Sequence, residues 1–138
     1  MRTVCPHCNT RNRVDPARID QGPVCGACKA LLFPGEPVTL TTSTFDTFVR
    51  SNDLPVVVDF WATWCGPCRA MAPQFAAAAR ELRGRVQFAK VDTDAEPALA
   101  TRFGIRSIPT IIRFMAGEEA ERRAGAMSAA DVRRWVNA

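Results

Sequence analysis

Apolar residues follow a regular pattern after residue 37, and this pattern predicts alternating strands and helices. Residues 55–61, PVVVDFW, form a short β-branched run of the kind found in strands buried on both faces. Residues 68–82 show the longer period of a helix, interrupted or kinked at Pro73. Further strands are predicted at 38–40, 86–91, 109–115 and 118–125, and further helices near 45–49, at 96–103 and after 128. This order predicts an α/β sandwich around a central mixed sheet.

Several polar residues and glycines mark where these elements begin and end. Ser43 with Asp46 resembles a capping box at the start of the first helix. The apolar residues of that helix share one face: Phe45, Phe48 and Val49. Gly104 closes the helix at 96–103, residues 116–117 (Ala-Gly) predict a turn between two strands, and Ser128 is the predicted cap of the last helix.

Residues 1–36 differ from the rest of the chain. They are rich in Cys, Pro, Gly, Asn and Asp and show no sustained helical or strand period. This composition predicts a loop-built module that cannot supply its own hydrophobic core. We therefore expect two units, a small module at 1–36 and a main domain at 37–138.

Composition and charge limit the function classes. With 138 residues, 47% of them apolar, the chain suffices for one packed domain plus a small appendage. Residues 1–36 carry five basic and three acidic residues, and the remainder carries thirteen and eleven. Because no basic run accompanies this modest charge of +4, neither a nucleic-acid-binding tail nor a membrane-binding segment is predicted.

The cysteine pattern indicates metal binding or redox chemistry. The N-terminus lacks the apolar stretch of a signal peptide, and no apolar run approaches the length of a membrane span. We therefore expect a soluble, cytoplasmic protein. Thiols are kept reduced in that compartment, so six cysteines in three Cys-x-x-Cys pairs point away from a structural disulfide framework.

The first two pairs have the spacing of a four-cysteine zinc site. Cys5 with Cys8 and Cys25 with Cys28 can each form a tight turn that presents two thiolates to one ion. Four protein ligands would leave no open catalytic position, and zinc would supply folding free energy that the module lacks. The alternatives are two local disulfides or free thiols. His7 is expected to be exposed and not to bind the metal, since four thiolates fill the coordination sphere.

The third pair, Cys65 and Cys68, follows the predicted strand and opens the predicted helix. Free backbone N–H groups and the dipole at a helix N-terminus favour an anion, so Cys65 is expected to be the more readily ionised thiol. The spacing places both sulfurs on one side of the first turn, within reach of a disulfide. Gly66 and Pro67 suit the turn and bring no carboxylate near a thiolate. A reactive dithiol is favoured over a buried structural pair.

Three segments of the main domain carry a resemblance to a known family. VVVDFWATWCGPCRAMAP at 56–73 looks like the active-site segment of thioredoxins. FGIRSIPTIIRFMAGE at 103–118 and RRAGAM at 122–127 look like the two later motifs of that family. Residues 4–14 and 25–38 resemble the zinc-binding extension of the bacterial thioredoxin-2 type. The resemblance covers the whole chain and implies a thioredoxin fold preceded by a four-cysteine zinc ribbon.

The resemblance also implies roles for individual residues. It implies Cys65 as the attacking thiolate, Cys68 as the resolving thiol, and Pro109 as a cis-proline that faces them. The residues implied for substrate binding are Trp64, Gly66, Pro67, Ile108, Pro109, Gly125 and Ala126. Gly125 would allow close approach of substrate backbone because it lacks a side chain.

Asp59 is an acidic residue within the apolar run at 55–61. A buried carboxylate is costly to ionise, so its pKa is expected to rise. The residues alone leave open whether it is functional or a strand-end residue that reaches water. The resemblance matches it to the family's buried acid, which helps move the proton from Cys68. Lys90, otherwise interpreted as a surface lysine, matches the family's lysine near that acid.

The implied activity is protein-disulfide reduction by thiol–disulfide exchange, with a mixed disulfide on Cys65. We expect one zinc ion, no organic cofactor, a monomer, target proteins that contain disulfides, and thioredoxin reductase as electron donor. The alternative from another class is an interaction module in which residues 1–36 bind nucleic acid or a partner protein. Its support is limited to five basic residues: Arg2, Arg11, Arg13, Arg18 and Lys29.

Overall fold

The computed structural model describes residues 1–137, and it contains a small and a large β-sheet. In chain order the elements are β1 (Arg2–Val4), β2 (Arg11–Arg13), the 3₁₀ helix η1 (Pro16–Gln21), β3 (Val38–Thr39), α1 (Phe45–Arg50), β4 (Val56–Trp61), α2 (Gly66–Glu81), β5 (Gln87–Asp92), α3 (Pro97–Arg102), β6 (Thr110–Met115), β7 (Glu118–Ala124) and α4 (Ala129–Val136). From β3 onward this order is the predicted one. Within residues 1–137, no helix has the length and apolar character needed to cross a membrane.

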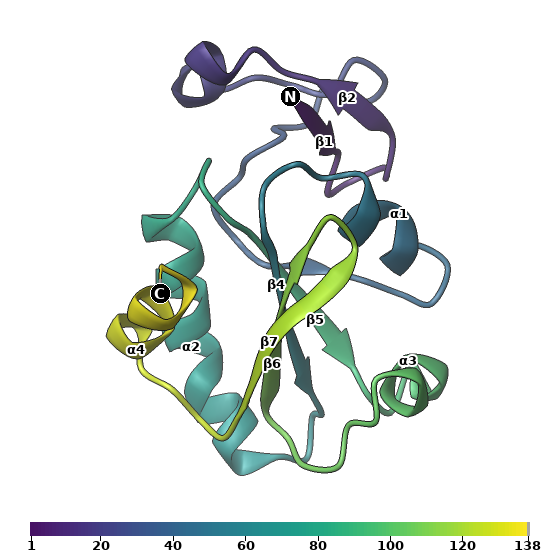
Figure 1. Cartoon of the computed structure of the whole chain (residues 1–138), viewed down its shortest axis with the longest axis vertical. Helices are drawn as coiled ribbons and strands as arrows, with labels where there is room; N and C mark the ends of the chain where they lie inside the picture. Colours follow the sequence, from purple (N-terminus) through teal and green to yellow (C-terminus); the bar gives the residue numbers. More distant parts are fainter. Residues whose placement is uncertain (138) are drawn as a thin grey trace.

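A five-stranded mixed sheet with the order β3-β5-β4-β6-β7 forms the centre of the molecule (Figure 1). Strands β3, β5 and β4 run parallel. On the other side of β4, β6 pairs antiparallel with β4, and β7 pairs antiparallel with β6. Helices α2 and α4 cover one face of the sheet, and α1 and α3 cover the other. The predicted sandwich around a mixed sheet is confirmed.

The central strand β4 is buried on both faces. Val58 and Phe60 belong to the apolar cluster beneath α1 and α3, whereas Val57 belongs to the cluster beneath α2 and α4. Asp59 lies opposite Ile111 of β6, and Ile111 is also part of the cluster beneath α2 and α4. Since directly opposite residues of antiparallel strands share a face, the Asp59 carboxyl group lies on the side covered by α2.

The structure confirms most predicted element ends. Ala116 and Gly117 have φ angles of 52° and 84°, as a two-residue turn with positive φ at both positions requires between β6 and β7. Gly104, with φ of 60°, follows α3. Ser128 is the N-cap of α4, and its hydroxyl oxygen accepts a hydrogen bond from the backbone N–H of Asp131 at 3.1 Å.

The predicted capping box at Ser43 and Asp46 is wrong. The N-cap of α1 is Thr44, and its side chain makes no capping hydrogen bond. The Asp46 carboxylate instead accepts two hydrogen bonds, at 2.9 and 3.1 Å, from the guanidinium group of Arg102 in α3. A contact between two helices therefore replaces the local contact that the sequence pattern suggested.

Residues 1–36, called the ribbon below, contain more regular structure than the sequence predicts. β1 and β2 pair antiparallel, with Arg2 opposite Arg13, and η1 follows them. Five buried residues form a cluster in the ribbon: Cys5, Val14, Cys25, Leu32 and Phe33. The prediction of a loop-built module without its own core is thus wrong in part. Strands of three residues are too short to show an alternating pattern, and two of the five core residues are cysteines.

Strand β1 also enters the main core. Val4 is fully buried and belongs to the cluster beneath α1 and α3. The buried Asn52 side chain, just after α1, accepts hydrogen bonds from the Thr3 hydroxyl at 2.8 Å and from the Val4 N–H at 3.1 Å. Asn52 Nδ2 in turn donates to the Phe48 carbonyl oxygen at 2.7 Å. Buried polar groups that are fully paired in this way fix the position of β1.

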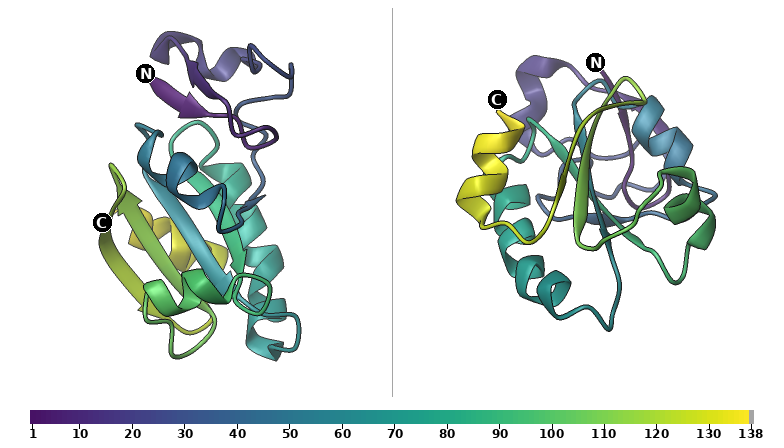
Figure 2. Two further views of the ribbon diagram at one scale, coloured as in Figure 1. Left: turned by 90° about the vertical axis from the view of Figure 1, so that its right-hand side faces the viewer. Right: turned by 60° about the horizontal axis from the view of Figure 1, so that its bottom comes forward.

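The ribbon lies at one end of the large sheet, beyond the starts of β4 and β5 (Figure 2). Arg2 forms an ion pair with Asp53 at 3.0 Å, and Gln87, the first residue of β5, donates a hydrogen bond to the Thr3 hydroxyl at 3.3 Å. Helix α2 begins at the opposite end of the sheet, after the last residue of β4.

Val4→Ala is expected to lower the free energy of unfolding of the main domain by about 2 kcal/mol, because it leaves a cavity in the main core. Denaturant unfolding followed by tryptophan fluorescence measures this, since all three tryptophans lie outside the ribbon. Val24→Ala is the control: Val24 also lies in the ribbon but is 48% exposed, and a change below about 0.5 kcal/mol is expected. Equal effects of the two substitutions would contradict the joint core.

Candidate active site and metal centre

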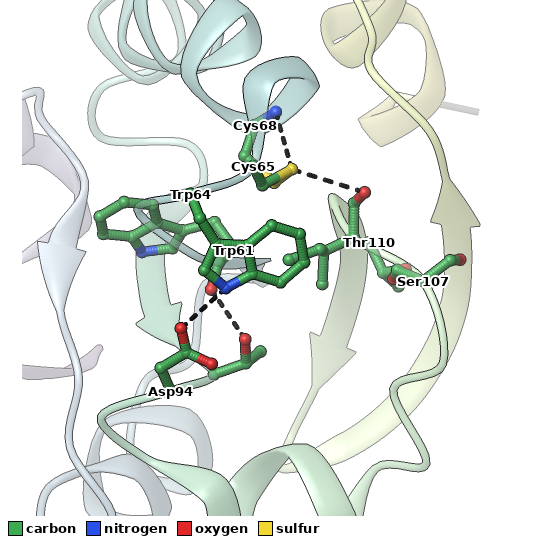
Figure 3. The surroundings of a disulfide bond; sticks show 9 residues. Trp61, Trp64, Cys65, Cys68, Asp94, Ser107 and Thr110 are labelled. Atoms are coloured by element: carbon green, nitrogen blue, oxygen red, sulfur yellow. Dashed lines mark hydrogen bonds between the residues drawn. A yellow bond between two sulfur atoms is a disulfide. The ribbon is translucent and has the colours of Figure 1, made fainter.

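Cys65 and Cys68 form a disulfide at the N-terminus of α2, with Cα atoms 5.2 Å apart (Figure 3). Cys65 is the N-cap residue, and its Sγ accepts a hydrogen bond from the Cys68 backbone N–H at 3.2 Å. Gly66 and Pro67 begin the helix, where the missing N–H of proline removes no helical hydrogen bond. When the pair is reduced, the same N–H group and the helix dipole favour a negative charge on Cys65.

One further segment contacts the disulfide, and a third segment is hydrogen-bonded to that segment. Ile108 packs against the cysteines, and its carbonyl oxygen lies 3.7 Å from Cys65 Sγ. The Ile108–Pro109 peptide bond is cis. The Pro109 carbonyl oxygen accepts a hydrogen bond from the Gly125 N–H at 2.8 Å, so the loop after β7 is tied to this proline. Gly125 has φ of 98°, a conformation that favours glycine.

Trp64 is the largest exposed apolar side chain next to the disulfide. It is 68% exposed, and its indole N–H donates a hydrogen bond to the Asp94 carboxylate at 2.8 Å (Figure 3). Asp94 lies in the loop after β5. This bond holds an apolar ring at the surface beside Cys65, although exposing apolar surface to water is unfavourable.

Asp59 is 1% exposed, and neither carboxylate oxygen has a hydrogen-bond partner among residues 1–137. Burial raises the pKa of Asp59 to about 7, and the positive charge of Lys90 opposes part of that rise. Lys90 lies directly opposite Asp59 on β5, and its ammonium group sits 4.5 Å from the centre of the Trp61 ring. Near neutral pH, Asp59 can therefore exist in both protonation states and can accept or release a proton.

The four cysteines of the ribbon converge on one point. Their sulfur atoms all lie within 4.8 Å of one another, with 3.6 Å between Cys5 and Cys28 and between Cys8 and Cys25. Zn–S bonds of about 2.3 Å in a tetrahedron require S···S separations of about 3.8 Å. The four thiols therefore fit one zinc ion. His7, which is exposed, is not part of the cluster.

Both Cys-x-x-Cys turns have the same backbone form. Asn9 and Lys29, which follow the second cysteine of each pair, have φ of 63° and 67°. Their N–H groups donate to the carbonyl oxygens of Cys5 and Cys25 at 2.9 and 3.0 Å. Backbone N–H groups inside each turn also donate to Sγ of its first cysteine, at 3.3 to 3.4 Å. Such donors favour the thiolate form that binds metal.

Asn12 joins the two turns. Its side-chain oxygen accepts a hydrogen bond from the Gly26 N–H at 2.9 Å, and its Nδ2 donates to Cys25 Sγ at 3.4 Å. The backbone N–H of Cys28 and the Asn12 amide lower the pKa of Cys25 to about 6. Burial raises the pKa of Cys5 to about 12. Cys5 and Cys25 therefore differ widely in how readily their thiols ionise.

Two family models match the chain. The model described as Thioredoxin matches residues 36–138, and the model described as Thioredoxin 2, N-terminal matches residues 4–30. The chain belongs to the thioredoxin family. The predicted thioredoxin fold with an N-terminal four-cysteine zinc-ribbon module is confirmed, and the Cys65–Cys68 disulfide is that of a thiol–disulfide oxidoreductase.

Similar proteins cover most or all of this thioredoxin. Thioredoxin C-3 of Corynebacterium nephridii is 41% identical over 137 residues, which is 99% of this chain and 94% of that protein. Thioredoxin 1 of Nostoc sp. is 46% identical over 88 residues, covering 64% of this chain and 82% of that protein. The crystal structure of chloroplastic thioredoxin z superposes with a TM-score of 0.69 at 34% identity, covering 74% of this chain and 92% of that one.

The structure brings most residues singled out in the sequence to three adjoining segments. Trp64 to Cys68 form the first segment, Ile108 with Pro109 the second, and Gly125 the third. Ala126 is exposed and lines an open cavity of about 540 Å³ toward α4. Asp59 and Lys90 lie opposite each other in the sheet.

Sequence reasoning missed two supporting residues of this thioredoxin. Asp94 holds the Trp64 ring. The sequence feature that could have pointed to Asp94 is its position just after a strand of the central sheet. Asn12 joins the zinc-ribbon turns, but nothing in its sequence neighbourhood connects it with Cys25, thirteen residues away. Both contacts depend on how separate segments fold together.

Asp59→Asn is expected to stabilise the oxidised protein above about pH 8 and to lose this advantage as the pH falls to about 3, below the ordinary pKa of a carboxyl group. The pKa of Asp59 is raised from 3.8 to about 7 in the folded state, so the folded state holds this proton more tightly than the unfolded state. Its contribution to stability therefore falls as the pH rises through this window, by about 4 kcal/mol in total.

Urea unfolding of wild type and Asp59→Asn across this pH range provides the measurement. The difference between the two proteins isolates Asp59, because all other titrating groups are shared. A difference that does not change with pH would show that the carboxyl group titrates near its usual value.

Proposed function

We propose that this thioredoxin reduces disulfide bonds of target proteins, with Cys65 as the attacking thiolate and Cys68 as the resolving thiol. The observation that carries this assignment is the hydrogen bond from the Cys68 N–H to Cys65 Sγ at the N-cap of α2. Cys68 lies inside the first turn of the helix and is 1% exposed. Cys65, at 4%, is the more exposed of the two, and Cys68 is within bonding reach of its sulfur.

The exchange proceeds in two displacements. The Cys65 thiolate attacks one sulfur of the target disulfide, which forms a mixed disulfide and releases the other target sulfur as a thiolate. Cys68 then loses its proton and attacks Cys65 Sγ, which releases the second target thiolate and leaves the Cys65–Cys68 disulfide. The target gains two electrons, and the dithiol loses them.

Asp59 is the proposed acceptor of the Cys68 proton, and Lys90 is the residue that adjusts its acidity. Two facts support this role: the carboxyl group has no hydrogen-bond partner within residues 1–137, and it lies on the sheet face covered by α2. A pKa of about 7 suits a group that must take up and release a proton near neutral pH. Lys90 opposes the pKa rise, so the acceptor keeps a useful ionised fraction.

The proposed docking surface for targets surrounds Cys65. It consists of Trp64, Gly66, Pro67, Ile108, Pro109, Gly125 and Ala126. The exposed Trp64 ring would supply apolar contact. No Cβ stands at Gly125, and the space around this position is open, so a target backbone can approach closely.

Residues 1–36 are proposed as a zinc-binding module, and residues 37–138 as the catalytic domain. The close approach of four sulfurs supports one zinc ion, which would hold the two turns of the ribbon together. Four thiolate ligands would remain intact in a reducing compartment, which supports a cytoplasmic location and regeneration by a thioredoxin reductase.

Cys68→Ser is expected to accumulate mixed disulfides with target proteins, because the first displacement proceeds and the second cannot. Cys65→Ser is the matched control, which removes the attacking thiolate and is expected to lower reduction of insulin disulfides to background. Non-reducing gel electrophoresis after incubation with an oxidised target measures trapping. If Cys65→Ser trapped targets through Cys68 instead, the assigned roles would be reversed.

The purified protein is expected to contain one zinc ion per chain. A strong chelator should remove it and increase hydrogen exchange in the two cysteine turns, since their geometry depends on a shared ion. The double substitution Cys65→Ser with Cys68→Ser is the control and should retain one zinc. Metal analysis and hydrogen exchange provide the readouts, and zinc loss in that double variant would place the metal at the dithiol instead.

A further inference from the structure

An exposed arginine lies beside the dithiol, in the segment of Ile108 that contacts the dithiol, and in the segment of Gly125 that is hydrogen-bonded to Pro109. Arg69 directly follows Cys68, Arg106 precedes Ile108 by two residues, and Arg123 precedes Gly125 by two residues. The three side chains come from a helix, a loop and the strand β7. Elements far apart in the sequence thus each carry a positive charge within two residues of Cys68, Ile108 or Gly125.

These arginines have no ion-pair partner within residues 1–137. The arginines that do form ion pairs there are Arg2, Arg50, Arg102, Arg113, Arg122, Arg133 and Arg134. An unpaired guanidinium group offers several N–H donors in a planar arrangement that matches a carboxylate. Arg69, Arg106 and Arg123 are therefore free to bind an acidic group from outside the chain.

The cavity beside Ala126 gives one of these arginines a defined setting. Arg123, Ala126 and Met127 line this open cavity of about 540 Å³. Two carboxylates also line it, but both are already engaged: Glu121 with Arg113 at 3.7 Å, and Asp131 with Arg134. The wall therefore offers apolar contact and one unpaired positive charge, which fits the side chain of Asp or Glu.

The acidic groups near the dithiol lie at the Trp64 side, in the loop after β5. The Asp94 carboxylate accepts the Trp64 N–H, and Asp92 Oδ1 accepts the backbone N–H groups of Asp94 and Ala95. Protein donors thus already use these carboxylates, whereas the arginines remain unused. Near the dithiol, a target therefore meets unpaired arginine side chains, whereas these two carboxylates already accept hydrogen bonds from the protein.

We propose that Arg69, Arg106 and Arg123 make this thioredoxin select target disulfides whose cysteines are flanked by Asp or Glu. The proposal rests on the proposed function, since it concerns the first displacement by Cys65. Complementary charge speeds encounter and disfavours like-charged partners. Because each exposed pair contributes little alone, three together are expected to give about tenfold selectivity at low salt.

Two disulfide peptides test this selectivity. They share one sequence except for the residues next to the cysteines, which are Glu in one peptide and Lys in the other. The second-order rate constant for reduction by the prereduced protein is measured for each peptide, with acid quenching and chromatography. Rates with dithiothreitol normalise the intrinsic reactivity of each disulfide, because flanking charge also changes thiol acidity.

Wild type is expected to favour the Glu peptide about tenfold at low ionic strength, and this ratio should shrink toward one near 1 M salt, where the Debye length is about 3 Å. The triple variant Arg69→Gln, Arg106→Gln, Arg123→Gln should show a ratio within about twofold of one. The control is Arg18→Gln, Arg80→Gln, Arg85→Gln, which removes the same charge from exposed arginines in the ribbon, in the last turn of α2 and after that helix. This control should keep the wild-type ratio.

The outcomes separate the two proposals. Equal rates for the two peptides with wild type would overturn the selectivity while leaving the reductase function intact. An equal loss of selectivity in both triple variants would also overturn it, because net charge rather than the position of the arginines would then be responsible. Failure of wild type to reduce either peptide, while dithiothreitol reduces both, would instead contradict the reductase function.

Discussion

The central strand β4 lies between two apolar clusters, so every side chain from Val56 to Phe60 is removed from water. Each buried Val or Phe contributes about 1.5–3 kcal/mol to stability. This gain offsets the cost of burying one carboxyl group, about 4 kcal/mol when it is ionised. Because Asp59 lies in this strand, the same packing that stabilises the fold also raises the pKa of its carboxyl group. The strand then ends at Trp61, and the next turn delivers Cys65 to the N-terminus of α2.

The two cysteine sites lie at opposite ends of the large sheet. The ribbon is anchored near the start of β4 by Val4 in the main core and by the buried amide of Asn52. Cys5 directly follows Val4, so a cysteine of the four-sulfur cluster and a residue of the main core are neighbours in the chain. The dithiol lies at the other end of the sheet, and the core around β4 lies between the two cysteine sites. The ribbon thus keeps its four-cysteine cluster away from the dithiol while it shares packing with the rest of the chain.

Most of this architecture could be predicted from local patterns. The alternation of apolar runs with helical periods predicted the order of elements from β3 onward, and the spacing of the ribbon cysteines predicted that they would gather at one point. Predictions failed where tertiary contacts replaced local ones. Asp46 binds Arg102 of α3 rather than capping α1, and Val4 packs in a core that its own segment does not build. The partners of Trp64 and Cys25 were missed for the same reason.

A direct titration of the Asp59 carboxyl group tests whether burial in β4 sets the acidity of this group. Selective ¹³C labelling of aspartate, with assignment from Asp59→Asn, allows the carboxyl carbon of the oxidised protein to be followed by NMR as pH changes. A midpoint of about 7 is expected. A midpoint near the ordinary value of 3.8 would contradict it, because the carboxylate would then have water or a partner that the packing around β4 does not provide.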